Sequence, residues 1–212
     1  DWKLIFDTLS EMREEIREHF PWRVVHVDRA EADDIIAVLT EFAQTNELVQ
    51  EGLVEEPQKI LILSSDKDFK QLQLYPNVKQ WSPMQKKYVT ASKQEIRDFM
   101  IEHIVKGDSG DGVPNIFSKD DVFVIGERQK VVSAKRLAEF IENGETACRS
   151  DEEKRNYARN QALVDFQFIP EDVQQSIIDA YLNTKPNTDK MKIMNYLMEN
   201  RCRLLLDEIE DF

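Results

Sequence analysis

The chain contains few of the residues that build zinc sites and disulfide frameworks, and it has no long apolar run. Its 212 residues include three histidines and two cysteines, and Cys148 and Cys202 show no CxxC or paired-histidine spacing, which excludes a disulfide scaffold and a zinc site. No stretch approaches the ~18 apolar residues of a membrane helix. Basic residues are also scarce, 28 against 41 acidic ones, so the formal charge is −13. We expect a soluble, cytoplasmic protein without a membrane partner, and charge alone argues against nucleic acid.

The first half of the sequence predicts an α/β core. Apolar residues over positions 2–20 recur at three- and four-residue steps, which is typical of an amphipathic helix. Residues 24–27 and 60–63 have the β-branched or apolar character of buried strands, and the second is as continuous as in a parallel sheet covered on both faces. A helix from about residue 31 to residue 48, followed by a polar loop over residues 50–58, would join them in a βαβ unit.

The chain then changes character near residue 107. Before it we expect a short helix over residues 66–74, an edge hairpin over residues 78–89, and a helix to about residue 105 that opens with a Ser92–Glu95 capping box. Beyond it the strand signals stop. Helices are expected near residues 133–143, 151–165, 172–182 and 189–209. The sequence thus predicts an α/β core followed by a helical module.

Three acidic clusters fall at the ends of these predicted elements. The first contains Glu31, Asp33 and Asp34. The others are residues 66–68, directly after the strand at residues 60–63, and residues 107–112, after the helix that ends near residue 105. Each cluster alone is explained equally well by helix capping or turn formation. Taken together they would lie at one rim of a parallel sheet, where uncompensated like charges repel.

A divalent cation would relieve this repulsion. Oxygen ligands without histidine or cysteine select Mg²⁺ or Mn²⁺ over zinc. The stretch from Asp66 is a poor EF-hand, because Lys70 and Gln71 stand where an acidic ligand and a glycine are required. Two Mg²⁺ ions ~3.5–4 Å apart suit the in-line hydrolysis of a phosphodiester. The residues therefore point to a metal-dependent phosphodiesterase.

In this order and spacing, three segments resemble the flap endonuclease/5′-3′ exonuclease family. They are residues 31–34 (EADD), 64–69 (SSDKDF) and 106–114 (KGDSGDGVP). Residues 75–84 (YPNVKQWSPM) and 126–128 (GER) bring the match closer to bacteriophage members. The resemblance spans essentially the whole chain.

The resemblance implies a fold and an activity. Residues 1–106 would form a PIN-like, Rossmann-like nuclease core with a partial parallel sheet and an edge hairpin, and residues 107–212 an all-helical DNA-binding module with a helix-three-turn-helix. The activity implied is Mg²⁺-dependent removal of RNA primers and 5′ flaps during DNA replication. Two Mg²⁺ ions, replaceable by Mn²⁺, would be the cofactor, and forked or flap duplex DNA and RNA–DNA hybrids the substrates.

The resemblance also assigns roles to residues. The catalytic residues would be Asp33, Asp66 and Asp68. The metal ligands would be Glu31, Asp33, Asp34, Asp66 and Asp68 at the first ion, and Asp108 and Asp111 at the second. The DNA-binding residues would be Lys106, Gly107, Gly112, Lys119, Arg128, Lys130, Lys135 and Arg136.

The chain departs from the family pattern at its start. Two strands with metal-binding aspartates and a basic arch are expected before residue 1, so the chain looks like the C-terminal two-thirds of such a nuclease. It would be either a split gene product completed by a separate N-terminal chain or a truncated piece of a longer nuclease. A single-strand-binding protein and a sliding clamp are further partners by analogy. The alternatives are a non-catalytic structure-specific DNA-binding module and a small-molecule phosphatase or receiver-like domain. The three histidines are expected to be surface or core residues without a role in the site.

Overall fold

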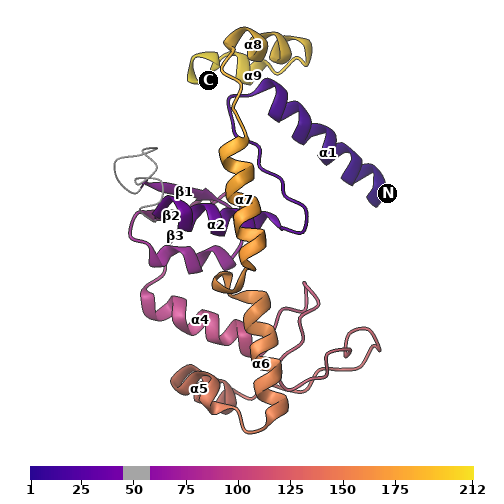
Figure 1. Cartoon of the computed structure of the whole chain (residues 1–212), viewed down its shortest axis with the longest axis vertical. Helices are drawn as coiled ribbons and strands as arrows, with labels where there is room; N and C mark the ends of the chain where they lie inside the picture. The colour runs from indigo at the N-terminus through magenta and orange to yellow at the C-terminus, as the bar shows by residue number, and fades with distance from the viewer. Residues whose placement is uncertain (45–57) are drawn as a thin grey trace. The chain divides into compact units, whose positions relative to one another are not determined.

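The chain folds into two compact units in a computed structural model that describes residues 1–44 and 58–212 (Figure 1). The smaller unit combines Asp1–Glu31 with Gln175–Phe212, and the larger comprises Ala32–Gln174. No helix of these described ranges is long and apolar enough to cross a membrane. The predicted loop over residues 50–58 lies outside the described residues, apart from Gln58.

The smaller unit is built from the two ends of the chain. As predicted, α1 (Trp2–His19) is a helix, and the carboxylate of Asp1 caps it by accepting from the backbone N–H of Lys3. Its last turns pack on the C-terminal helices through a buried core of Phe20, Ile193 and Leu197. The elements of the C-terminal part are α7 (Glu171–Asn183), which begins in the larger unit, α8 (Lys190–Glu199), α9 (Arg203–Leu206) and the 3₁₀ turn η4 (Ile209–Asp211).

The prediction of a single helix over residues 189–209 is wrong, because the structure divides this segment into α8 and α9. Arg201 between them has a φ of 57°, a left-handed conformation that an α-helix cannot contain. Asn200 closes α8 by donating its backbone N–H to the carbonyl of Tyr196. The division therefore follows from the local backbone at residues 200–201.

The strand predicted over residues 24–27 is also wrong. These residues are described and have no regular secondary structure, so the predicted βαβ unit is absent. A short β-branched run becomes a strand only where another strand receives its hydrogen bonds, and all strands of the described sheet come from residues 60–89. Arg23 instead lies over the Tyr181 ring at 4.6 Å and donates to the Tyr181 carbonyl at 2.9 Å.

The larger unit contains a three-stranded mixed sheet in the order β1-β2-β3. β1 (Ile60–Leu63) pairs in parallel with β2 (Val78–Ser82), which pairs antiparallel with β3 (Lys87–Val89). This confirms the predicted edge hairpin and a partial parallel sheet. The crossover from β1 to β2 passes through a short 3₁₀ helix, η1 (Asp68–Leu74).

Only one face of β1 is covered by the described residues. Ile62 is buried, whereas Leu61 and Leu63 are 51% and 68% exposed. The expectation that both faces of this strand are covered is therefore not met within residues 1–44 and 58–212. Two exposed leucines on a strand are unusual for a parallel sheet, whose strands are normally buried on both faces.

Helices complete the larger unit. α2 (Ala32–Gln44) packs on η1, and α4 (Lys93–Lys106) packs on η1, α5 (Ala134–Asn143) and α6 (Asp151–Val164). The predicted capping box of α4 is present: Ser92 Oγ accepts from the Glu95 N–H, and Glu95 Oε2 accepts from the Ser92 N–H. The remaining short elements are the 3₁₀ turns η2 (Gly144–Ala147) and η3 (Phe166–Phe168).

The two compact units of the structure are not separated at residue 107, where the sequence predicts a domain boundary. α4 lies before that boundary and α5 and α6 after it, yet all three share one buried cluster. That cluster contains Ile101, Ile104, Val105, Ile116, Phe140, Tyr157 and Val164. A functional division into residues 1–106 and 107–212, and a helix-three-turn-helix across the turns between α4 and α5, stay predictions.

Phe140 anchors this cluster, so truncating it tests the packing. Its ring is fully buried and lies 6.0 Å from the Tyr157 ring and 6.2 Å from the Phe117 ring. Phe140→Ala should lower the free energy of unfolding by ~3–5 kcal/mol, because it removes contacts and leaves a cavity. Chemical denaturation measures this loss. Val131→Ala is the control, since Val131 is 87% exposed and should change stability by less than ~0.5 kcal/mol; equal effects would contradict the assignment.

Candidate metal and nucleic-acid site

The second acidic cluster forms a tight turn directly after β1. The backbone N–H of Asp66 donates to Ser64 Oγ at 3.1 Å, and the N–H of Asp68 donates to Asp66 Oδ1 at 2.9 Å. These bonds fix the carboxylate of Asp66 and the backbone of Asp68 relative to the end of the strand. Acidic side chains at the carboxyl end of a parallel strand occupy the position where open α/β sheets bind ligands.

Asp108 of the third cluster meets this turn. Lys67 Nζ donates to Asp108 Oδ2 at 2.9 Å, and the backbone N–H of Gly110 donates to Asp108 Oδ1 at 2.9 Å. The hydrogen bond from Lys67 is the main reason that the pKa of Asp108 is lowered to about 2. The same bond raises the pKa of Lys67, helped by the charges of Asp108, Asp68 and Asp66. The second and third clusters are therefore in contact.

His103 joins the two clusters from α4, a role that the sequence did not predict. Its Nδ1 lies 3.1 Å from Asp68 Oδ1 and its Nε2 lies 3.2 Å from Asp108 Oδ2. Burial lowers the pKa of His103, but the close carboxylate of Asp68 outweighs burial and leaves that pKa raised. A single histidine forms no motif. The one feature of the sequence that could have indicated this role is the position of His103 one helical turn before the third cluster.

The first cluster approaches the same place through α2. Asp33 and Asp34 occupy the first turn of α2, where acidic residues favour the helix dipole. The pKa of Asp33 is raised, first by burial and then by the charges of Asp34 and Asp66. Mutual repulsion of this kind requires that Asp33 and Asp66 lie close together. Carboxylates from all three clusters thus share one region of the larger unit.

Of the other two predicted ligands, Glu31 belongs to the smaller unit. Asp111 is exposed in the loop after α4, and its side chain has no hydrogen bond or ion pair with any residue that the structure describes. The roles of all the acidic residues as metal ligands stay predictions.

The carboxylate oxygens of this region are the type of ligand that a hard divalent cation prefers. They do not, however, surround a position where such an ion would be held. Within residues 1–44 and 58–212, no three His, Cys, Asp or Glu side chains converge to hold an ion. Asp68 Oδ1 is nevertheless buried without an aligned hydrogen-bond donor, although His103 Nδ1 is close to it. A buried carboxylate oxygen in this state has a free lone pair, which is what an oxygen-seeking cation such as Mg²⁺ requires.

The predicted DNA-binding residues lie mainly in the irregular stretch between α4 and α5. Gly107 and Gly112 have φ values of 66° and 75°, and a Cβ on Gly107 would lie 2.3 Å from the Val113 carbonyl oxygen, so glycine is required there. Lys106 is exposed and paired with Glu102. The side chains of four others are exposed, without an ion pair in the part of the chain that the structure describes: Lys119, Arg128, Lys130 and Lys135.

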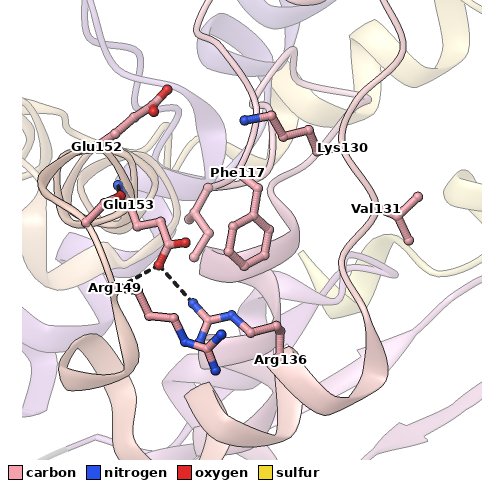
Figure 2. A pocket seen from close by; sticks show the side chains of 9 residues that line it. Phe117, Lys130, Val131, Arg136, Arg149, Glu152 and Glu153 are labelled. Carbon is pink, nitrogen blue, oxygen red and sulfur yellow. Dashed lines mark hydrogen bonds and ion pairs between the residues drawn. The ribbon is translucent and has the colours of Figure 1, made fainter.

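Arg136 differs from these four because its guanidinium forms ion pairs within the protein (Figure 2). It donates to Glu139 at 2.7 Å and to Glu153 at 2.8 Å, and it lies over the Phe117 and Phe140 rings. Arg136, Phe117 and Glu153 border a pocket of about 470 Å³ that Lys130 and Arg149 also line. Arg136 therefore has a clear structural role, and its contact with phosphate stays a prediction.

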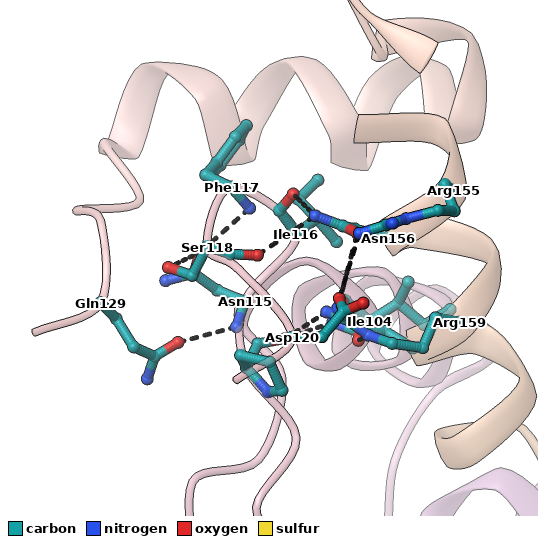
Figure 3. Close-up of polar contacts among 12 residues, drawn as sticks. Ile104, Asn115, Ile116, Phe117, Ser118, Asp120, Gln129, Arg155, Asn156 and Arg159 are labelled. Atoms are coloured by element: carbon teal, nitrogen blue, oxygen red, sulfur yellow. Dashed lines mark hydrogen bonds and ion pairs between the residues drawn. The ribbon is translucent and has the colours of Figure 1, made fainter. Parts of the chain in front are cut away.

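Two asparagines of α6 hold the loop that carries Asp108 (Figure 3). The Nδ2 of Asn160 donates to the carbonyls of Ile104 and Pro114, the two ends of that loop, at 2.7 and 2.9 Å. Asn156, one turn earlier, donates to the carbonyls of Ile116 and Ser118. Both asparagines are fully buried.

A second group of bonds holds the base of the basic stretch (Figure 3). The side chain of Asn115 accepts from the Phe117 N–H and donates to the Lys130 carbonyl, and the backbone N–H of Asn115 donates to Gln129 Oε1. Ser118 Oγ accepts from the Lys130 N–H at 2.9 Å. The backbone of Lys130 is thus fixed while its side chain is exposed.

Comparison with known proteins identifies the family of the chain. The family model described as T4 RNase H, C terminal, matches residues 93–212. Ribonuclease H of Enterobacteria phage T4 is 33% identical over 218 residues, an alignment that covers all of this chain and 68% of the relative. The crystal structure of the T5 D15 protein co-crystallised with metal ions has a similar fold, with a TM-score of 0.55 and 16% identity over 84% of this chain and 68% of that one.

The chain is therefore a nuclease-family protein with the flap endonuclease/5′-3′ exonuclease fold. Within that class it belongs to the family of T4 ribonuclease H. The resemblance inferred from the three acidic segments is confirmed.

The ion pair between Lys67 and Asp108 predicts how the stability of the fold depends on pH. Because the pKa of Asp108 in the folded chain, about 2, is below its ordinary value of 3.8, this carboxylate stabilises the fold above about pH 4 and the contribution is lost as the pH falls towards 2. Lys67→Met should raise the pKa of Asp108 towards 3.8 and remove that contribution. NMR titration of side-chain carboxyl groups measures the pKa, and urea denaturation at several pH values measures the stability.

Lys70→Met provides the matched control. Lys70 lies over the Phe99 ring at 5.0 Å, and is not among the groups that lower the pKa of Asp108. This variant should leave the pKa of Asp108 at about 2. An equal pKa of Asp108 in the two variants would show that Lys67 does not hold it.

Proposed function

We propose that this chain is the metal-binding and DNA-binding part of a structure-specific 5′ nuclease that removes RNA primers and 5′ flaps during replication. The observation that carries the proposal is the meeting of the acidic clusters after β1 and α4 in a member of the T4 ribonuclease H family. Its substrates would be forked or flap duplex DNA and RNA–DNA hybrids.

The proposed cofactor is a pair of Mg²⁺ ions, which Mn²⁺ can replace. Asp33, Asp34, Asp66 and Asp68 would hold the first ion, with Glu31 nearby, and Asp108 and Asp111 the second. When bound, such ions polarise a phosphoryl group and activate water at neutral pH. The carboxylates orient the ions, and the exposed basic residues after α4, chiefly Lys119, Arg128, Lys130 and Lys135, would bind the phosphates of the duplex.

We further propose that an additional N-terminal segment completes the site, on the same polypeptide or on a separate one. The relative from phage T4 is longer, since the alignment covers 68% of it. The exposed Leu61 and Leu63 on β1 support a strand or helix that covers them, because parallel strands are normally buried on both faces. Such a segment would also add ligands to a set of carboxylates that is not closed.

The test is cleavage of a 5′-labelled flap substrate by this chain mixed with a candidate N-terminal segment. Mg²⁺-dependent release of the flap is expected, with a loss of at least ~100-fold in Asp33→Ala and in Asp66→Ala, because each removes a carboxylate from the ion that stabilises the transition state. Lys70→Met, which leaves the acids intact, should retain activity.

Two other outcomes would overturn parts of the proposal. Cleavage that survives both alanine substitutions would refute the metal role of these aspartates. Salt-sensitive binding to forked duplex with no product in Mg²⁺ or Mn²⁺ would indicate a non-catalytic DNA-binding module.

A further inference from the structure

Gln80 is a buried polar residue in the middle of the sheet. It lies on β2, opposite Ile62 of β1 and Val89 of β3, and only 1% of its surface is exposed. A buried amide is tolerated in a sheet only where both its donor and acceptor are paired. The contacts of this side chain therefore indicate what it stabilises.

The amide of Gln80 contacts the backbone on both sides of the second acidic cluster. Its Nε2 donates to the Ser64 carbonyl at 3.0 Å and to the Asp66 carbonyl at 2.6 Å. Its Oε1 accepts from Gln73 Nε2 at 3.1 Å, and Gln73 Oε1 in turn accepts from the Ala91 N–H. One side chain thus links the start of the acidic turn, the turn itself and the end of η1.

The position of Gln80 matters because the strand ladder stops just before the aspartates. The last ladder bond runs from the Ser64 N–H to the Trp81 carbonyl at 3.1 Å. Beyond it, the carbonyls of Ser64 and Asp66 have no strand partner, and Gln80 supplies the donors that a strand would otherwise give. Since Asp66 Oδ1 receives the Asp68 N–H, fixing the backbone of Asp66 also fixes Asp68.

We propose that Gln80 is a positioning residue for the carboxylates of Asp66 and Asp68, which it holds in place through the backbone of residues 64–66. This inference rests on the proposed function, which assigns those carboxylates as metal ligands. The hydrogen bonds of Gln80 are present without any metal. Groups that orient metal ligands from behind typically change metal affinity or activity by ~10–100-fold when removed.

The first test measures backbone opening in the full chain without metal. Gln80→Leu should speed amide hydrogen exchange at Asp66 and Asp68 by at least ~10-fold, because two carbonyls of the turn lose their donors. Gln71→Leu is the matched control: Gln71 is also a buried glutamine, but it donates to the Val164 carbonyl and accepts from the Phe166 N–H. Equal exchange at Asp66 and Asp68 in the two variants would overturn the proposal.

The second test measures Mg²⁺ binding through the amide chemical shifts of residues 64–68. Gln80→Leu should weaken the apparent affinity by ~10–100-fold relative to Gln71→Leu. Unchanged affinity would overturn the proposal. If the wild-type chain shows no response to Mg²⁺, the proposed metal function fails, while hydrogen exchange still decides whether Gln80 holds the turn.

A milder variant serves if Gln80→Leu does not fold. Gln73→Leu keeps the amide of Gln80 but removes the partner of its Oε1, so Gln80 can rotate away from the two carbonyls. Exchange at Asp66 and Asp68 should then rise several-fold in a folded chain. Exchange equal to the wild type would overturn the proposal.

Discussion

The compensation of negative charge beside the end of β1 is the interaction on which the candidate site depends. Asp66, in the turn after β1, raises the pKa of Asp33 on α2, and Lys67 of the same turn is bonded to Asp108 in the loop after α4. Lys67 is the cation that the chain itself supplies to Asp108, and the imidazole of His103 contacts both Asp68 and Asp108. Without them, like charges in one place would oppose folding. A divalent ion bound by Asp108 would therefore compete with Lys67 for the same oxygen.

Buried amides are the second device on which this arrangement depends. The acidic residues lie on irregular backbone, whose polar groups cannot be satisfied by a helix or a strand ladder. Gln80 from β2 and Asn160 from α6 each donate two hydrogen bonds to such backbone, at the turn of Asp66 and at the ends of the loop of Asp108. The loops are thus tied to the core, and the carboxylates of Asp68 and Asp108 stay partly exposed. An amide suits this task because it carries two donors on one nitrogen.

Local signals allowed part of the fold to be predicted. The amphipathic pattern of α1, the capping box of α4 and the hairpin of β2 and β3 are encoded within a few residues, and each is present. The prediction of a strand at residues 24–27 was wrong because a strand requires a partner strand, which the local sequence does not specify. The interruption at Arg201 was missed since no glycine marks it. In the site, the acidic clusters carried a motif, whereas Gln80, and His103 in its contact with Asp68, act through residues distant in sequence.

The charge of the chain has a different meaning once the acids are located. A net charge of −13 argues against nucleic acid only if the negative charge is spread over the surface that meets phosphate. Here several carboxylates are grouped, and the exposed basic residues after α4 lie on a separate stretch whose backbone is fixed by Asn115 and Ser118. Under the proposed function, phosphate groups would meet the cationic side chains of that stretch, while the acidic group would repel them until cations neutralise it. Divalent ions would thus control the approach of the scissile phosphate as well as its hydrolysis.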